Sequence, residues 1–179
     1  MSEQKQVLEP WTEDPLHRLR RAVERRENVA VCGPPLFERI DLIDRLVKWI
    51  RPDARVIVLE GRVGENLNVN GDLLPANNLV VMHGIDTQGG ASFEELFRSV
   101  ASMRADYLVL PDVKLEHLDS YRANVARIPT PRLVGIDADA NDPSIRSTSD
   151  VVVDVTSDRV QPLGIGGIWA CPLPPRVGV

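Results

Sequence analysis

The sequence contains few of the residues on which metal centres, disulfide frameworks and membrane spans depend. Its two cysteines, Cys32 and Cys171, stand far apart and without metal-ligand spacing, which argues against a disulfide framework and a zinc site. His17, His83 and His117 share no ligand spacing either. No apolar stretch approaches the roughly 20 residues needed to cross a bilayer, and the polar start MSEQKQVLEPW lacks the apolar core of a signal peptide. These absences predict a cytoplasmic protein with no metal ion and no membrane insertion.

The chain also has fewer basic than acidic residues, 21 Lys and Arg against 26 Asp and Glu. With a net charge of -5, the chain lacks the broad cationic surface on which nucleic-acid and anionic-lipid binding depend. The basic segment DPLHRLRRAVERREN places Leu16, Leu19 and Val23 at helical spacing, so its arginines are expected to form the solvated face of an amphipathic helix. The composition therefore predicts no nucleic-acid partner.

What the sequence does contain is an alternation of short apolar runs with amphipathic segments, which is typical of α/β proteins with a mainly parallel sheet. A length of 179 residues with 43% hydrophobic residues allows one domain with a real core. Strands are expected in the segments NVAVC, RVIVLE, NLVVMHG, DYLVLP, RLVGID and DVVVDVT. Helices are expected over residues 15–26, 38–50, 92–104 and 114–126. The pattern predicts a doubly wound sheet of about six or more strands.

The ends of the chain differ from this core pattern. Residues 1–14 form a polar N-terminal segment, and the tail over residues 171–179 is rich in proline, which cannot continue a helix or a central strand. The core pattern lies between these two segments. Within it, TQGGAS is expected to be a loop that ends in Ser92 as a helix N-cap, and LGIGGI to be a flexible or tightly turning connection.

The segment VAVCGPPLFERID, residues 29–41, joins a β-branched run to a helical pattern through Gly33, as a phosphate-binding loop does. Such a loop has the form GxxxxGK[ST]. Its glycines let N–H groups face the phosphates, its lysine neutralises their charge and its hydroxyl holds magnesium. With Gly33 as the first glycine, Glu38 takes the place of the second, Arg39 that of the lysine and Ile40 that of the hydroxyl.

These substitutions remove phosphate-binding chemistry. Pro34 and Pro35 have no N–H to offer and fix φ near about -65°, Glu38 brings a carboxylate, and Ile40 cannot ligate magnesium. Arg39 alone keeps a cation. A carboxylate at a helix N-terminus is favoured by roughly 0.3–1 kcal/mol, so one interpretation is a self-capped turn that needs no nucleotide. The same residues also fit a plain strand-ending turn.

With this frame in place, the chain resembles the catalytic core of the type II and type IV secretion and pilus-assembly ATPases, especially the tight-adherence pilus branch. DPLHRLRRAVERRENVAVCG is similar to the helix, paired basic residues and strand before that family's Walker A loop. IRPDARVIVLEG is similar to its acidic-box strand, with Glu60 at the catalytic glutamate. SFEELFRSVASMRADYLVLPDV resembles its helix, turn and Walker B strand, with Asp112 in place of a glutamate. DADANDP resembles its histidine segment, with Asp139 at the histidine.

The resemblance implies a RecA-like P-loop NTPase fold over residues 15–170, but it is poor at the chemical positions. Gly61 stands where the family has a second acidic-box carboxylate. The resemblance therefore assigns vestigial Walker A positions to Gly33, Glu38, Arg39 and Ile40, and vestigial catalytic positions to Glu60, Asp112 and Asp139. We expect no working catalytic, cofactor-binding or metal-binding residues.

Three functions agree with these observations. The leading hypothesis is a pseudo-ATPase without a nucleotide cofactor, which serves as a protein-interaction or regulatory module for a secretion or pilus ATPase, a second copy of itself or another assembly. The first alternative is an unorthodox nucleotide enzyme in which Arg39 replaces lysine and Glu60 or Asp112 organises magnesium. The second is a small-molecule-binding α/β domain with its ligand at the carboxyl ends of the strands.

Overall fold

The computed structural model describes residues 15–34, 36–60, 78–83, 91–114, 117–125, 127–155 and 168–170. The expected terminal segments 1–14 and 171–179 lie outside the described residues, as does Gly61. Among the described residues, no helix combines the length and apolar composition that crossing a bilayer requires.

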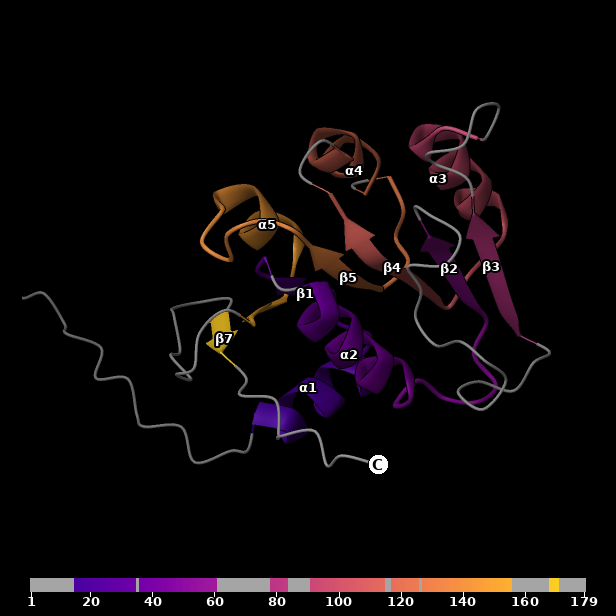
Figure 1. Ribbon diagram of the computed structural model, residues 1–179. Helices are drawn as coiled ribbons and strands as arrows, with labels where there is room; N and C mark the ends of the chain where they lie inside the picture. The colour runs from indigo at the N-terminus through magenta and orange to yellow at the C-terminus, as the bar shows by residue number, and fades with distance from the viewer. Residues whose placement is uncertain are drawn as a thin grey trace, which may run out of the picture.

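The described residues form one seven-stranded sheet with the order β3-β2-β4-β5-β1-β6-β7 (Figure 1). All neighbouring strands run parallel. The strands are β1 (Val29–Cys32), β2 (Val56–Glu60), β3 (Leu79–His83), β4 (Tyr107–Val113), β5 (Arg132–Ile136), β6 (Val151–Asp154) and β7 (Ile168–Ala170). The predicted α/β class and parallel sheet are therefore confirmed.

Helices cover both faces of the sheet. They are α1 (Pro15–Glu24), α2 (Leu36–Val47), α3 (Phe93–Ser102), α4 (Leu118–Val125) and α5 (Pro143–Thr148). Figure 1 shows α1 and α2 together on one face and α3, α4 and α5 on the other. The two faces have separate cores, because alternate residues of each strand point to opposite sides. Val29 and Val31 of β1 pack with α1 and α2, whereas Ala30 and Cys32 pack on the opposite side.

Most of the expected elements are present, with two additions. All six expected strands and all four expected helices occur, although α2 begins at Leu36 instead of Glu38. The short helix α5 and the edge strand β7 were not predicted; β7 begins at the last residue of LGIGGI. Ser92 caps α3 as expected: its side chain accepts the Glu95 N–H, and the Glu95 carboxylate accepts the Ser92 N–H at 2.8 Å.

A β-bulge interrupts the pairing of β4 with β5. The register passes from Leu110 opposite Val134 to Val113 opposite Ile136, so β4 uses one more residue than β5 over this stretch. The bulge contains Pro111, which has no N–H and is otherwise unfavourable in a central strand. The side-chain alternation of β4 is consequently reversed for its last two residues.

Candidate functional site at the carboxyl ends of β1, β4 and β5

The loop after β1 sets the position of the candidate site. Cys32 ends the buried strand, and Gly33 follows with φ of 128°, a conformation that favours glycine because it has no Cβ. The Gly33 N–H donates to the Ile136 carbonyl at 3.3 Å, which holds the loop against the end of β5. The chain then enters α2 at Leu36. The strand, the glycine and the helix thus follow one another in the order predicted for residues 29–41.

Arg39, on the first turns of α2, is the centre of the site. It is a fully buried arginine with only 1% of its surface exposed. Its Nη2 donates to Asp112 Oδ1 at 2.7 Å, and its Nη1 lies 3.5 Å from Asp137 Oδ1. Nη1 also donates to the carbonyl oxygen of Gly33. The arginine at the lysine position is thus bound by the protein's own acceptors.

The β-bulge explains how Asp112 reaches Arg39. Leu108, Leu110 and Val113 all belong to the core beneath α3 and α4. In a regular strand, residue 112 would share a face with 108 and 110. The extra residue reverses this alternation and brings Asp112 to the α2 side, where it meets Arg39.

Gly135 of β5 makes room for the bulge. A Cβ at this position would lie 2.1 Å from the Pro111 carbonyl oxygen and 3.0 Å from Cδ1 of Ile43. Both distances are too short for an ordinary contact, and the first involves backbone that cannot simply rotate away. The glycine is therefore required for the position of Asp112.

The thiol beside this site is chemically inert. Burial raises the pKa of Cys32 to about 12, with the Asp154 carboxylate adding to the shift and the Arg39 guanidinium opposing it. The thiol consequently stays protonated at neutral pH and is a poor nucleophile. Cys32 is thus a small buried side chain of the core.

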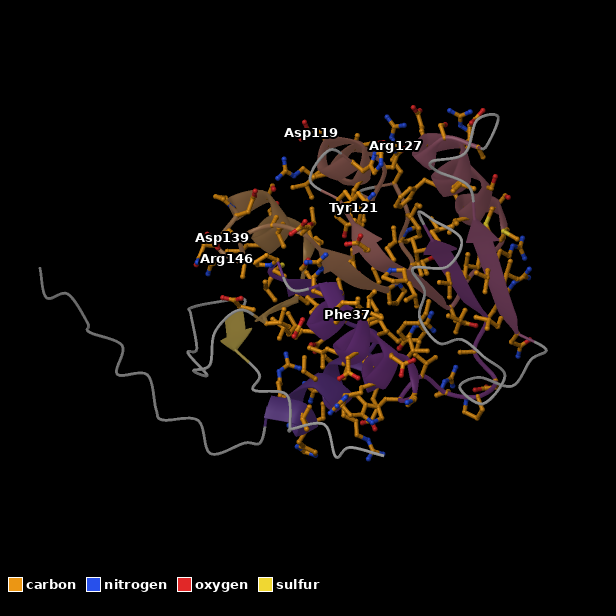
Figure 2. All side chains as sticks on the ribbon, viewed as in Figure 1. Phe37, Asp119, Tyr121, Arg127, Asp139 and Arg146 are labelled. Carbon is orange, nitrogen blue, oxygen red and sulfur yellow. The ribbon has the colours of Figure 1, made fainter. Side chains whose placement is uncertain are left out.

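Asp139, Glu38 and Ile40, which the resemblance also singled out, do not join this group. Asp139 is exposed and accepts the backbone N–H of Asn141 at 2.8 Å within its own turn (labelled in Figure 2). Glu38 is exposed in the first turn of α2, and Ile40 packs against the core beneath that helix. Glu60 is the last residue of β2. Next to Glu38, Phe37 presents an apolar ring that is 72% exposed (Figure 2).

The structure brings Gly33, Arg39 and Asp112, three of the positions that the resemblance singled out, together at one edge of the sheet, and adds Asp137, which sequence reasoning missed together with the pairing itself. A signal for Asp137 existed, because it directly follows the apolar run of β5 and the carboxyl ends of parallel strands meet at one edge. Within the part of the chain that the structure describes, no group of three or more His, Cys, Asp or Glu side chains is arranged to hold a metal ion.

Comparison with known proteins supports the fold. No protein-family profile matches the chain, and no curated protein matches it. Among solved structures, the VirB11 ATPase from the Brucella suis type IV secretion system, in complex with sulphate, matches with a TM-score of 0.57 and 20% identity. The match covers 74% of this chain and 37% of that chain, so this chain spans little more than a third of its neighbour's length. The seven-stranded parallel sheet and this likeness show that the chain has a RecA-like α/β fold, similar to that of a secretion ATPase.

Proposed function

We propose that the chain is a pseudo-ATPase: a RecA-like domain that does not turn over nucleotide and acts as a protein-interaction or regulatory module. The observation that carries this proposal is the buried Arg39, whose guanidinium is bound by Asp112, Asp137 and the Gly33 carbonyl. In a phosphate loop, the cation at this position neutralises the phosphates of the nucleotide. Here it neutralises carboxylates of the same chain.

The charge of the site also disfavours a nucleotide. Arg39 contributes one positive charge, while Asp112 and Asp137 contribute two negative ones, so phosphates would meet a net negative site. Pro34 has no N–H to donate, and the Gly33 carbonyl faces the guanidinium. A nucleotide would have to displace an internal ion pair and would gain few donors in return.

The likeness of fold suggests where such a module acts. We infer a place beside secretion or pilus ATPases of the tight-adherence type, in the cytoplasm, with an active ATPase subunit or a second copy of this chain as partner. Support comes from the family-like order of segments in the sequence and from the fold shared with a type IV secretion ATPase. A contact surface between subunits does not require the phosphate chemistry, so it can persist after that chemistry is lost.

The direct test is calorimetric titration with ATP, ADP and GTP in the presence of magnesium, together with an assay of phosphate release. We expect no binding at millimolar nucleotide and no release above the buffer blank. The informative variant is Asp112→Asn/Asp137→Asn, which keeps side-chain shape and removes both charges from Arg39. This variant should gain weak affinity for sulphate, because the guanidinium then lacks an internal anion.

The matched control is Asp119→Asn/Asp139→Asn, two exposed carboxylates that make no contact with Arg39. It removes the same charge from the surface and should gain no sulphate affinity. Magnesium-dependent phosphate release by the native protein would favour the unorthodox nucleotide enzyme. Binding of a small metabolite at the carboxyl edge would favour the ligand-binding domain instead.

A further inference from the structure

A cavity lies at the opposite end of β4 from Asp112. It measures about 180 Å3 and is lined by Val23, Glu24, Arg26, Trp49, Arg51 and Tyr107. These residues come from the end of α1, the turn after α2 and the start of β4. No step of the proposed function uses this cavity, which we call the amino-edge pocket.

The pocket combines aromatic walls with two cationic side chains. The Arg26 guanidinium carbon lies 5.8 Å from the centre of the Tyr107 ring, within the range of a cation–π contact. The Tyr107 hydroxyl donates to the Val23 carbonyl, so its ring is fixed between α1 and β4. Burial raises the pKa of Tyr107, and the guanidinium groups of Arg26 and Arg51 both oppose that shift. Both cations therefore act on the same ring.

Each arginine has one aspartate partner among the described residues, at the long end of the ion-pair range. Arg26 Nη2 donates to the Asp106 carbonyl at 3.2 Å and lies 3.4 Å from Asp106 Oδ1. Arg51 Nε lies 3.7 Å from Asp53 Oδ1, and this pair is mostly exposed. Exposed pairs of this length are weak. The one acid of the pocket, Glu24, already pairs with Arg20 at 2.9 Å. The pocket thus offers two guanidinium groups to an incoming anion.

The backbone at Arg26 is unfavourable for an arginine. Its φ is 63°, and the hydrogen bonds Arg26 N–H to Val23 O and Glu27 N–H to Ala22 O form a Schellman motif that ends α1. Glycine is the usual residue at this place because it has no Cβ to strain. An arginine here costs conformational energy, and its side chain contributes to the pocket. Strain of this kind points to a functional role.

We propose that the amino-edge pocket binds a small planar carboxylate of about the size of one aromatic ring. The cavity is well below the roughly 300–1,000 Å3 of pockets for drug-sized ligands, so only a small molecule fits. The carboxylate pairs with the arginines, and its ring stacks with Trp49 and the planar guanidinium of Arg26. This proposal is independent of whether the carboxyl edge binds nucleotide.

The test is an NMR titration of the full chain with benzoate at constant ionic strength, observing the Trp49 indole N–H. The expected result is a saturating shift with a dissociation constant on the order of 1 mM. Arg26→Gly should weaken binding about tenfold, and so should Arg51→Ala. Because glycine relieves the positive φ, Arg26→Gly keeps the fold, and its thermal midpoint should not fall. Loss of binding in that variant therefore cannot be attributed to unfolding.

Two further arms make the outcome decisive. Arg98→Ala is the matched control, since Arg98 is an exposed arginine paired with Glu94 on α3, and it should bind benzoate as the native chain does. Acetate tests the stacking and should bind at least about threefold more weakly than benzoate. Absence of a saturating shift with benzoate, native affinity in both pocket variants, or equal affinity for acetate would overturn the proposal.

Discussion

The described structure has two buried arginines, Arg39 and Arg132. Arg39 lies at the carboxyl ends of the strands and Arg132 at the amino end of β5, and their hydrogen-bond partners differ. Arg39, at the carboxyl edge, pairs with two carboxylates and one carbonyl. Arg132, the first residue of β5, donates to backbone carbonyls and lies beside the Tyr121 hydroxyl, and none of the described carboxylates pairs with it. Its Nη1 donates to Val125 O at 3.4 Å and Ile128 O at 3.2 Å, and its Nη2 donates to Thr148 O at 3.0 Å.

The difference separates an arginine that binds the ends of two helices from one that forms a buried ion pair at the candidate site. Carbonyls at helix C-termini carry partial negative charge, so Arg132 stabilises the ends of α4 and α5 without a counter-ion. Arg39 instead forms an ion pair, in which the positive charge of the guanidinium and the negative charge of the carboxylate compensate each other. Removing one partner of such a pair leaves an uncompensated charge. The following substitutions test this distinction.

The largest effect is expected from Arg39→Met, which keeps an unbranched apolar stem and removes the guanidinium with its charge. It should lower the free energy of unfolding by about 3–5 kcal/mol, because Asp112 is left beside the core without its cation. Adding Asp112→Asn should recover about 1 kcal/mol of that loss, and Asp137→Asn should add little, because the Asp137 carboxylate is half exposed and lies 3.5 Å from Arg39 Nη1. Urea denaturation of the single and combined variants measures both. A loss below about 1 kcal/mol for Arg39→Met would contradict the description of the pair as buried.

The second-largest loss of stability is expected from Gly135→Ala. The added Cβ collides with the Pro111 carbonyl, so the bulge must shift at a cost of about 3 kcal/mol. The NMR signals of Arg39 should move, whereas the hydrogen-exchange protection of the ends of α4 and α5, where Arg132 binds, should change little beyond the global loss. Alanine accommodated without loss of stability would show that the bulge is not sterically fixed.

Arg132→Met should cost about 2 kcal/mol, the scale of hydrogen bonds to a charged group. Since only carbonyls are left without a donor, no acid-to-amide substitution should rescue it, unlike Arg39→Met. Arg132→Lys should restore part of the loss, because an ammonium group can still donate to these carbonyls. Equal losses for methionine and lysine would mean that packing of the side chain, and not its charge, stabilises the helix ends.

The smallest effect is a pH dependence at the opposite end of α5. Asp142 caps this helix, and the side-chain hydrogen bond from Ser144 lowers the pKa of its carboxyl below the ordinary value of 3.8. Because the folded-state pKa is depressed, this group stabilises the fold above about pH 4, and the stabilisation is lost as pH falls further. Asp142→Asn also removes the ion pair with Arg122 and should cost about 0.5 kcal/mol near neutral pH.

The measurement is a series of urea transitions from pH 3 to pH 7. The difference between native chain and Asp142→Asn should narrow toward the acid end, whereas the difference between native chain and Arg132→Met should persist there. α5 would then be held by a pH-sensitive contact at its start and a pH-insensitive one at its end. A constant difference for both variants would contradict this.

The framework of the fold could be predicted because its signals are local. Runs such as VAVC and RLVGI are buried on both faces, so they read as continuous apolar strands whatever lies around them. Short elements gave no such signal. α5 spans six residues with Ile145 as its one buried side chain, and β7 spans three residues.

The site could be predicted only in part, because the contacts of Arg39 cross 73 and 98 residues of sequence. The expectation that Asp112 lies at the strand end was sound, but its direction depended on a bulge. Two residues carried that information. Pro111 is unfavourable in a central strand unless a bulge accommodates it, and Gly135 marks a close approach of backbone. The pairing of Arg39 with Asp137 had no comparable local sign.

The buried thiol of Cys32 can report how often the centre of the sheet opens. The side chain lies at the end of a central strand, between the two layers of helices, and its sulfur stays protonated and covered while the sheet is intact. In a Cys171→Ser background, an alkylating reagent can react only when β1 separates from its neighbours. The rate of modification at low reagent concentration then reports how often the centre of the sheet opens, which a signal from the exposed surface cannot give.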